Sequence, residues 1–242
     1  MSTLGTLEAG SRYDLRVGLS PDAPDESELK DDGQGAFGYV HSYETSSRYD
    51  GPGLRAVLFV SGCLLRCTYC HNPDTWHLKD GTYISAQQVV DRLGQFASAL
   101  RALDGGLTIS GGEVMVQLAF TKRILAGAKQ MGLHTAIETS GFLGDRVDDS
   151  YLSVLDLVLL DIKSSNPDTY KAVTGRDLAP TLRFAERLAK MNKPVRVRFT
   201  LVPGHTDDPA NVEGIAKFVA PMKNVEWVEV QPFHKMGEFK WK

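Results

Sequence analysis

The stretch Cys63-Leu64-Leu65-Arg66-Cys67-Thr68-Tyr69-Cys70 holds all three cysteines of this 242-residue chain, and the rest of the sequence is organised around it. Three thiols spaced C-x3-C-x2-C predict a single metal site. Three thiolates can bind three of the four irons of a [4Fe–4S] cube and leave the fourth iron without a protein ligand. Because an open iron can bind a small chelating molecule, the stretch indicates chemistry as well as electron storage.

Other interpretations of the three thiols compete with the cluster. Buried cysteines behave as small hydrophobic residues, but three of them in one glycine-flanked loop are unusual for a core. A structural zinc site usually has a second ligand pair far along the chain, and this sequence has no second cysteine pair. The odd number of cysteines disfavours a disulfide framework. A zinc or iron–sulfur binding module without catalytic activity stays open as the alternative from another functional class.

The composition is that of a soluble globular protein, with 42% hydrophobic and 24% charged residues. The length suits one α/β domain. We expect no membrane span and no secretory leader, because long apolar runs are missing and the first residues lack a basic start. Reduced thiols fit the cytoplasm. The net charge of −3 argues against a general nucleic-acid binder.

Residues 1–35 differ from the rest of the chain. They contain eight acidic and three basic residues, and prolines and glycines interrupt any periodicity. This composition predicts a flexible acidic N-terminal extension at 1–35, with residues 36–242 forming the folded domain.

From Gly38 onward, short apolar runs alternate with helical patterns. The pattern predicts strands at 54–60, 107–110, 134–138, 157–160, 194–202 and 225–230, and helices at 85–100, 116–131, 148–154, 178–191 and 211–220. Such alternation is typical of parallel βα units with right-handed crossovers. Six strands are too few for a complete (β/α)8 barrel, so we expect an α/β fold with a partial (β/α)6 TIM-like barrel. The chain ends soon after the sixth strand, so we expect no closing C-terminal helix.

Polar residues follow the predicted strands at their carboxyl ends, where barrels of this kind form their sites. They are Ser110–Glu113, Glu138–Gly141, Asp161 with Lys163, Arg198, and Gln231–His234. Each also has a structural interpretation: a glycine turn, a helix cap, a core aromatic at Tyr69, a structural His234, or an Asp50–Arg198 ion pair.

The cysteine motif, with an aromatic residue before its last cysteine, resembles that of the radical S-adenosylmethionine (radical SAM) superfamily. Asp50-Gly51-Pro52-Gly53-Leu54-Arg55 upstream and His71-Asn72-Pro73-Asp74-Thr75-Trp76 downstream narrow the resemblance to the glycyl-radical-enzyme activases. It runs from about Gly38 to the C-terminus. The chain departs from the family pattern at Glu138, where many members have Asp, and in ending at Lys242, where the family usually continues.

The resemblance implies cofactors and a site. A [4Fe–4S] cluster would be bound by Cys63, Cys67 and Cys70. The residues that would bind S-adenosylmethionine are Tyr69, Asn72, Gly111, Gly112, Glu113, Glu138, Thr139, Asp161, Lys163 and His234. A monovalent cation would lie beside Glu138. Asp50 and Arg198 would lie where a substrate peptide enters.

The resemblance also implies an activity. The enzyme would cleave S-adenosylmethionine reductively and take a hydrogen atom from a glycine Cα of pyruvate formate-lyase, leaving a glycyl radical. The electron would come from a flavodoxin or ferredoxin, and we expect a monomer in the cytoplasm. Activation of another glycyl radical enzyme, or a small-molecule radical SAM reaction, stays open because the site motifs overlap.

Overall fold

The computed structural model describes residues 34–241. The prediction of a flexible acidic extension therefore concerns a segment that lies outside the described residues, except for Gln34 and Gly35. These two residues lie against helix α3 (Leu118–Gln130): Arg123 donates to the Gln34 carbonyl at 2.9 Å, and a Cβ on Gly35 would lie 2.1 Å from the Ala119 carbonyl carbon.

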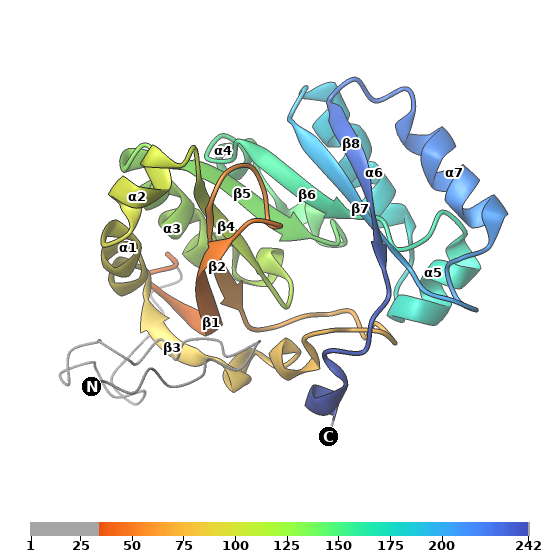
Figure 1. The fold of residues 1–242 in the computed structure, drawn as a ribbon, viewed down its shortest axis with the longest axis horizontal. Helices are drawn as coiled ribbons and strands as arrows, with labels where there is room; N and C mark the ends of the chain where they lie inside the picture. Colours follow the sequence, from red (N-terminus) through yellow and green to blue (C-terminus); the bar gives the residue numbers. More distant parts are fainter. Residues whose placement is uncertain (1–33, 242) are drawn as a thin grey trace, which may run out of the picture.

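The six predicted strands are present and parallel, and they lie side by side in chain order (Figure 1). They are β2 (Arg55–Val60), β4 (Gly106–Gly111), β5 (His134–Thr139), β6 (Leu157–Asp161), β7 (Val195–Leu201) and β8 (Val225–Pro232). The sheet is open, because β8 pairs only with β7 within the described residues. The prediction of a partial barrel is confirmed.

Two further strands were not predicted. β1 (Phe37–Ser47) and β3 (Thr82–Ser85) extend the sheet beyond β2 as antiparallel strands, giving the order β3-β1-β2-β4-β5-β6-β7-β8. β1 alternates buried and partly exposed positions, but Ser42 and Ser47 occupy buried positions. Burial alternates along β1, but hydrophobicity does not, because some buried positions hold serine. The sequence therefore lacks the alternating apolar pattern from which a strand is predicted.

The helices are α1 (Ala86–Gly94), α2 (Ala97–Ala102), α3, α4 (Asp149–Leu152), α5 (Pro167–Thr174), α6 (Ala179–Lys190) and α7 (Pro209–Val219). Ser85 and Gln88 form the expected capping box of α1. The single helix expected over 85–100 is instead two helices, because the chain turns at Gln95 and Phe96. Helix α5 was missed, although Asn166 caps it, Pro167 starts it and Gly175 ends it in the left-handed conformation.

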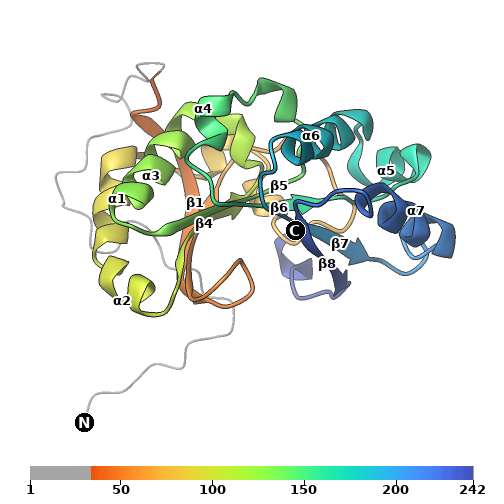
Figure 2. The ribbon, with the colours of Figure 1, turned by 90° about the horizontal axis from the view of Figure 1, so that it is seen from above.

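The helices form an arc outside the strands, as the view from above shows (Figure 2). Apolar side chains of the strands, including Ile109, Val158 and Leu160, are fully buried and form one core with helix residues such as Ile124 and Leu188. No helix within residues 34–241 is both long and apolar enough to cross a membrane.

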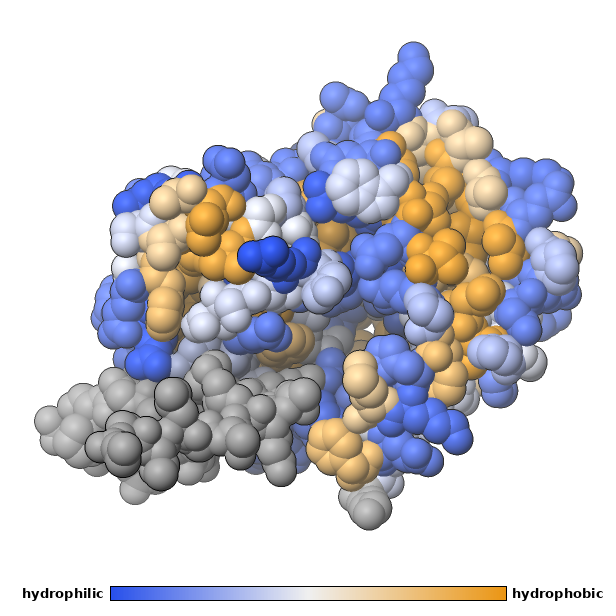
Figure 3. Space-filling model, in the orientation of Figure 1, coloured by the Kyte–Doolittle hydropathy of each residue, from blue (hydrophilic) through white to orange (hydrophobic). Residues whose placement is uncertain are grey.

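The outward face of β8 is unlike that of the other strands. Val228 and Val230 are 38% and 52% exposed, and Figure 3 shows an apolar area over this strand. Glu229 and Gln231, which alternate with them, are less exposed and line the pocket at the strand ends, where Val230 also contributes to the lining. The last strand thus contributes polar groups to the interior while its other face remains exposed.

Candidate active site

A pocket of about 620 Å³ lies at the carboxyl ends of the parallel strands. Its volume is in the range of small-molecule sites. The structure brings thirteen predicted residues together in its lining: Cys63, Cys67, Cys70, Tyr69, Asn72, Gly111, Gly112, Glu113, Glu138, Thr139, Asp161, Lys163 and His234. Their proximity is a finding, whereas the role of each in binding stays a prediction.

The cysteine loop follows β2 and is held by backbone hydrogen bonds on both sides. The N–H groups of Gly62 and Cys63 donate to the carbonyls of Thr75 and Trp76 at 2.8 and 3.0 Å. Further along, the Arg66 and Thr68 N–H groups donate to the end of α5. The three thiols are unpaired, so the loop presents them to the pocket without a disulfide.

Burial of the three thiols disfavours their charged, thiolate form. Burial raises the pKa of the Cys63 thiol to about 12 and that of Cys67 to about 11, and it also raises the pKa of Cys70. Thiolates in this setting need a strong positive charge nearby, which a bound metal supplies. Within residues 34–241, no three His, Cys, Asp or Glu side chains are grouped closely enough for one ion. Three dispersed thiols fit a cube with one thiolate per iron better than a single zinc ion.

Gly111, the last residue of β4, and Gly112 directly after it pass close to the backbone of β2 and of the residues that flank the cysteine loop. Gly111 has φ of +114°, and a Cβ there would lie 2.4 Å from the Val60 carbonyl oxygen. A Cβ on Gly112 would lie 2.4 Å from the Gly62 oxygen and 2.9 Å from the Thr75 oxygen. Close backbone approach within the protein is therefore sufficient reason for both glycines.

Glu113 joins two strand-end loops. Its buried carboxylate accepts hydrogen bonds from Thr139 Oγ1 and Ser140 Oγ, both at 2.6 Å, and from the Ser140 and Met115 N–H groups. With protein donors on both oxygens, Glu113 has a clear structural function. Its predicted contact with the amino group of S-adenosylmethionine stays a prediction.

The other charged residues of the pocket occur in pairs. Lys163 lies 3.0 Å from Asp161; burial lowers the pKa of Lys163, but Asp161 more than offsets this, so the amine stays protonated. Glu138 accepts from Ser110 and from Arg198, both at 2.5 Å. Burial raises the pKa of Glu138, but Arg198 outweighs it and keeps the carboxylate ionised.

Arg198 lies in the interior, with its side chain 4% exposed. It lies 3.6 Å from Asp50 and 3.4 Å from Glu229, and it donates to the Tyr49 carbonyl. Burial raises the pKa of Asp50, and the nearby Glu138 raises it further. The predicted Asp50–Arg198 contact is thus present. Tyr49, which is 84% exposed, lines the pocket from this segment, and substrate entry beside the ion pair stays a prediction.

The sequence reasoning missed several residues of the site. Glu229 could have been found from strand register, because it pairs directly with Arg198 across β7 and β8. Ser110 was predicted only as part of a strand end, and its bond to Glu138 follows from the adjacency of β4 and β5. The contacts of Lys240 and Trp241 with the cysteine loop had no signal in the sequence.

Comparison with known proteins supports the resemblance. Residues 57–218 match the Radical SAM superfamily. The chain is 41% identical over 212 residues to a pyruvate formate-lyase-activating enzyme of Listeria monocytogenes, covering 85% of this chain and 86% of that protein. It is 38% identical over 207 residues to the pyruvate formate-lyase 1-activating enzyme of Escherichia coli K12, covering 85% of this chain and 84% of that protein.

Solved structures agree with the fold. A domain of a pyruvate formate-lyase-activating enzyme from Bacteroides vulgatus is 26% identical, with a TM-score of 0.51 over 54% of this chain and 81% of that one. Streptococcus suis SuiB bound to its precursor peptide SuiA is 14% identical, with a TM-score of 0.62 over 74% of this chain and 39% of that one, which shows the fold alone. By sequence identity, matched length and fold, the chain belongs to the radical SAM superfamily and, within it, to the family of pyruvate formate-lyase-activating enzymes.

Proposed function

We propose that this protein cleaves S-adenosylmethionine reductively and removes a hydrogen atom from a glycine Cα of pyruvate formate-lyase, which leaves a glycyl radical in that enzyme. The observation that carries the proposal is the single pocket lined by the three thiols and by the polar ends of the parallel strands. The names of relatives at 38–41% identity support the choice of protein substrate.

The residues have distinct roles in this proposal. Cys63, Cys67 and Cys70 would hold a [4Fe–4S] cluster, and the glycine loop after β4 with Asp161 and Lys163 would lie along the methionine part of S-adenosylmethionine. When bound, the cluster and S-adenosylmethionine supply the one-electron chemistry that makes hydrogen abstraction from an unactivated C–H bond possible. The protein orients both and limits the access of water.

The adenine end has candidates on two sides of the pocket. Tyr69 offers a flat aromatic ring, and its hydroxyl has no hydrogen-bond partner in the described part of the chain. His234 and Asn72 lie in the same lining. Arg198 and Lys163 pair with Glu138 and Asp161, and the monovalent cation that the family implies beside Glu138 stays a prediction.

The test is formation of the glycyl radical itself. The protein is reconstituted with iron and sulfide without oxygen, reduced, and mixed with S-adenosylmethionine and pyruvate formate-lyase. The expected result is the glycyl doublet in the EPR spectrum, and its absence in a C67A control. Cleavage of S-adenosylmethionine without the doublet would favour a different substrate, and no cleavage by an iron-loaded protein would overturn the proposal.

We further propose a flavodoxin or ferredoxin as the electron donor, a monomeric state and a cytoplasmic location, on the strength of the family and of the reduced thiols. Replacing a chemical reductant with reduced flavodoxin in the same assay tests the donor.

A further inference from the structure

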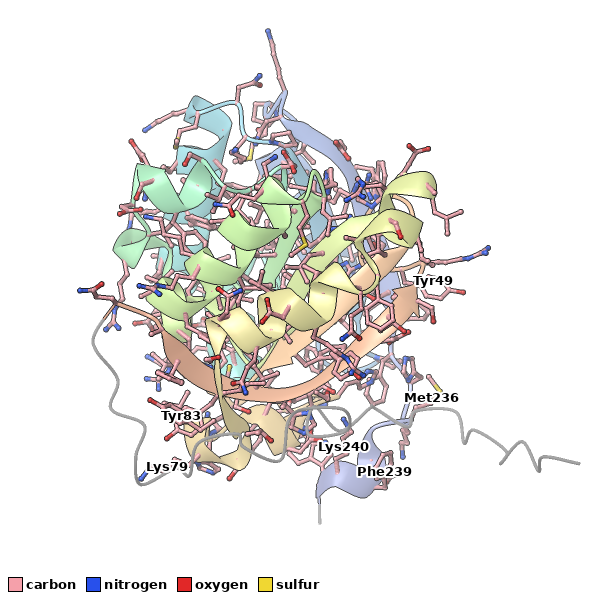
Figure 4. The ribbon with its side chains drawn as sticks, turned by 90° about the vertical axis from the view of Figure 1, so that its left-hand side faces the viewer. Tyr49, Lys79, Tyr83, Met236, Phe239 and Lys240 are labelled. Atoms are coloured by element: carbon pink, nitrogen blue, oxygen red, sulfur yellow. The ribbon has the colours of Figure 1, made fainter. Side chains whose placement is uncertain are left out.

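The C-terminal segment crosses over the end of the cysteine loop. After β8, residues 233–241, called the latch here, run alongside the loop residues 70–76, and both lie at the bottom of the view in Figure 1. The latch ends in the short helix Glu238–Trp241, which packs on the short helix Pro73–Thr75. Figure 4 shows Met236, Phe239 and Lys240 on this segment.

We propose that the latch holds the third cysteine of the loop in position, with Lys240 and Trp241 as positioning residues for the Cys70 sulfur. The inference deepens the proposed function and rests on it for the identity of the bound group. The contacts that carry it are between residues of the chain itself.

Trp241 holds the backbone at Cys70. Its indole N–H donates to the Cys70 carbonyl at 3.0 Å. Its ring also meets Trp76 edge-on, with ring centroids 5.3 Å apart, and Trp76 is the residue whose carbonyl accepts from the Cys63 N–H. One side chain thus contacts Cys70 directly and also contacts Trp76, the residue whose backbone is hydrogen-bonded to Cys63.

Lys240 acts on the other side of the same cysteine. Its amine donates to Asn72 Oδ1 at 2.9 Å and lies 3.3 Å from Asp74. The backbone N–H of Asn72 in turn donates to Cys70 Sγ at 3.4 Å. By holding Asn72, Lys240 fixes the N–H group that points at the sulfur. Hydrogen bonds from N–H groups to the ligand sulfurs are one of the factors that set the reduction potential of an iron–sulfur cluster.

A third set of contacts joins the latch to His71. The His71 Nε2–H donates to the His234 carbonyl at 2.9 Å, and the two rings are 4.2 Å apart. Gly237 passes so close that a Cβ there would lie 2.8 Å from the His71 carbonyl oxygen. His234, Gly237 and Lys240 of the latch therefore all contact the two residues that follow Cys70. Cys63 and Cys67, by contrast, belong to a segment that bonds to α5 and to the Thr75–Trp76 backbone.

The first test uses the metal-free protein, so that it does not depend on the cofactor. W241F removes the indole donor and keeps an aromatic ring, and K240M removes the amine and keeps the aliphatic stem. We expect amide hydrogen exchange in a peptide covering residues 68–77 to become about tenfold faster in each variant. F239A is the matched control, because Phe239 lies on the latch and is 67% exposed. K240R should restore slow exchange. Exchange equal to wild type in both variants would overturn the proposal.

The second test uses the reconstituted protein. Iron release to a chelator should be faster in W241F and K240M than in wild type and F239A, and the cluster midpoint potential should fall as the N–H···S contact loosens. Equal release and equal potential in all four proteins would overturn the role in holding Cys70. A wild-type protein that binds no iron would instead refute the proposed function, and the exchange experiment would still decide whether the latch orders the loop.

Discussion

At the scale of single residues, Gly112 shows most directly how the two central loops depend on each other. A methyl group on Gly112 would lie 2.4 Å from the Gly62 oxygen, which is backbone and cannot rotate away. We expect G112A to lower the free energy of unfolding by about 2–3 kcal/mol, as other forced overpacking does. Urea unfolding measures this.

The control for that substitution is G94A. Gly94 ends α1, and its Cβ would meet only the Met131 methyl at 3.7 Å, so alanine there should leave stability unchanged or raise it by about 0.5–1 kcal/mol. If G112A is as stable as G94A, the close approach of the two loops does not require glycine at position 112.

Within residues 34–241, Arg198 is the one cation that contacts all of the carboxylates in a cluster of three acidic residues. Its replacement by methionine leaves Glu138, Glu229 and Asp50 close to one another without the cation that pairs with all three. We expect R198M to be about 3–5 kcal/mol less stable at neutral pH, the usual cost of breaking a buried ion pair. Chemical unfolding of R198M and of the surface control R183M, whose Asp145 partner is 60% exposed, measures the difference. Equal losses in the two variants would contradict the buried role.

The sequence predicted which residues gather in the pocket better than it predicted what each one does. Thirteen residues from several strand ends meet because parallel strands end at one rim. The hydrogen bonds that occupy Glu113 depend on the side chains of Thr139 and Ser140 in the adjacent loop. These hydrogen-bond partners depend on how neighbouring strands and loops are aligned in space, and the spacing of residues along the sequence does not specify that alignment.

At the scale of elements, Asp156 stabilises the start of β5 by hydrogen bonding. Its carboxylate accepts from the Thr135 N–H at 2.9 Å and from Lys129 at 2.7 Å. Burial raises the pKa of Asp156, but these donors outweigh it and hold the pKa below the ordinary 3.8. The stabilisation is therefore fully present above pH 3.8 and is lost as the pH falls through the lower folded-state pKa.

We expect D156N to be about 1 kcal/mol less stable than wild type at pH 7, with a gap that narrows in strong acid. Unfolding curves at several pH values measure this. D177N is the matched control, since its pair with Lys171 is exposed on both sides and exposed pairs contribute little. A gap that is constant down to pH 2 would argue against the carboxylate as its cause.

The elements that the sequence revealed are those buried on both faces. β6 contains the run Leu-Val-Leu-Leu and is covered on both sides, so its apolar run was sufficient to predict a buried strand. At the edge of the sheet, β1 pairs with β2 and β3 pairs with β1, and the buried positions of β1 include serines. Pairing with an existing sheet stabilises such strands, and this tertiary contribution is absent from local propensity.

At the scale of the whole molecule, metal loading and folding should be linked. The folded loop brings the three thiols to one pocket, an arrangement that the unfolded chain does not hold, so a cluster would bind the folded protein and not the unfolded chain. We expect chelation of iron from the reconstituted protein to lower Tm by several degrees. Calorimetry of loaded and stripped protein measures this, with C67A expected to show one Tm in both treatments. An unchanged Tm after complete iron removal would count against a cluster held by the folded loop.

The open edge at β8 has a consequence for the size of what can react. The interior of a closed barrel is filled by side chains, so a reaction takes place at the rim that the carboxyl ends of the strands form. Here the row of strands stops after β8 within the described residues, and its last member has a single neighbour. Residues Glu229–Pro232 of this edge strand line the pocket, so one wall of the pocket is a strand with a single neighbour. On the proposed function, only the reacting loop of a protein substrate has to fit the pocket of about 620 Å³, and the rest of the substrate can stay outside.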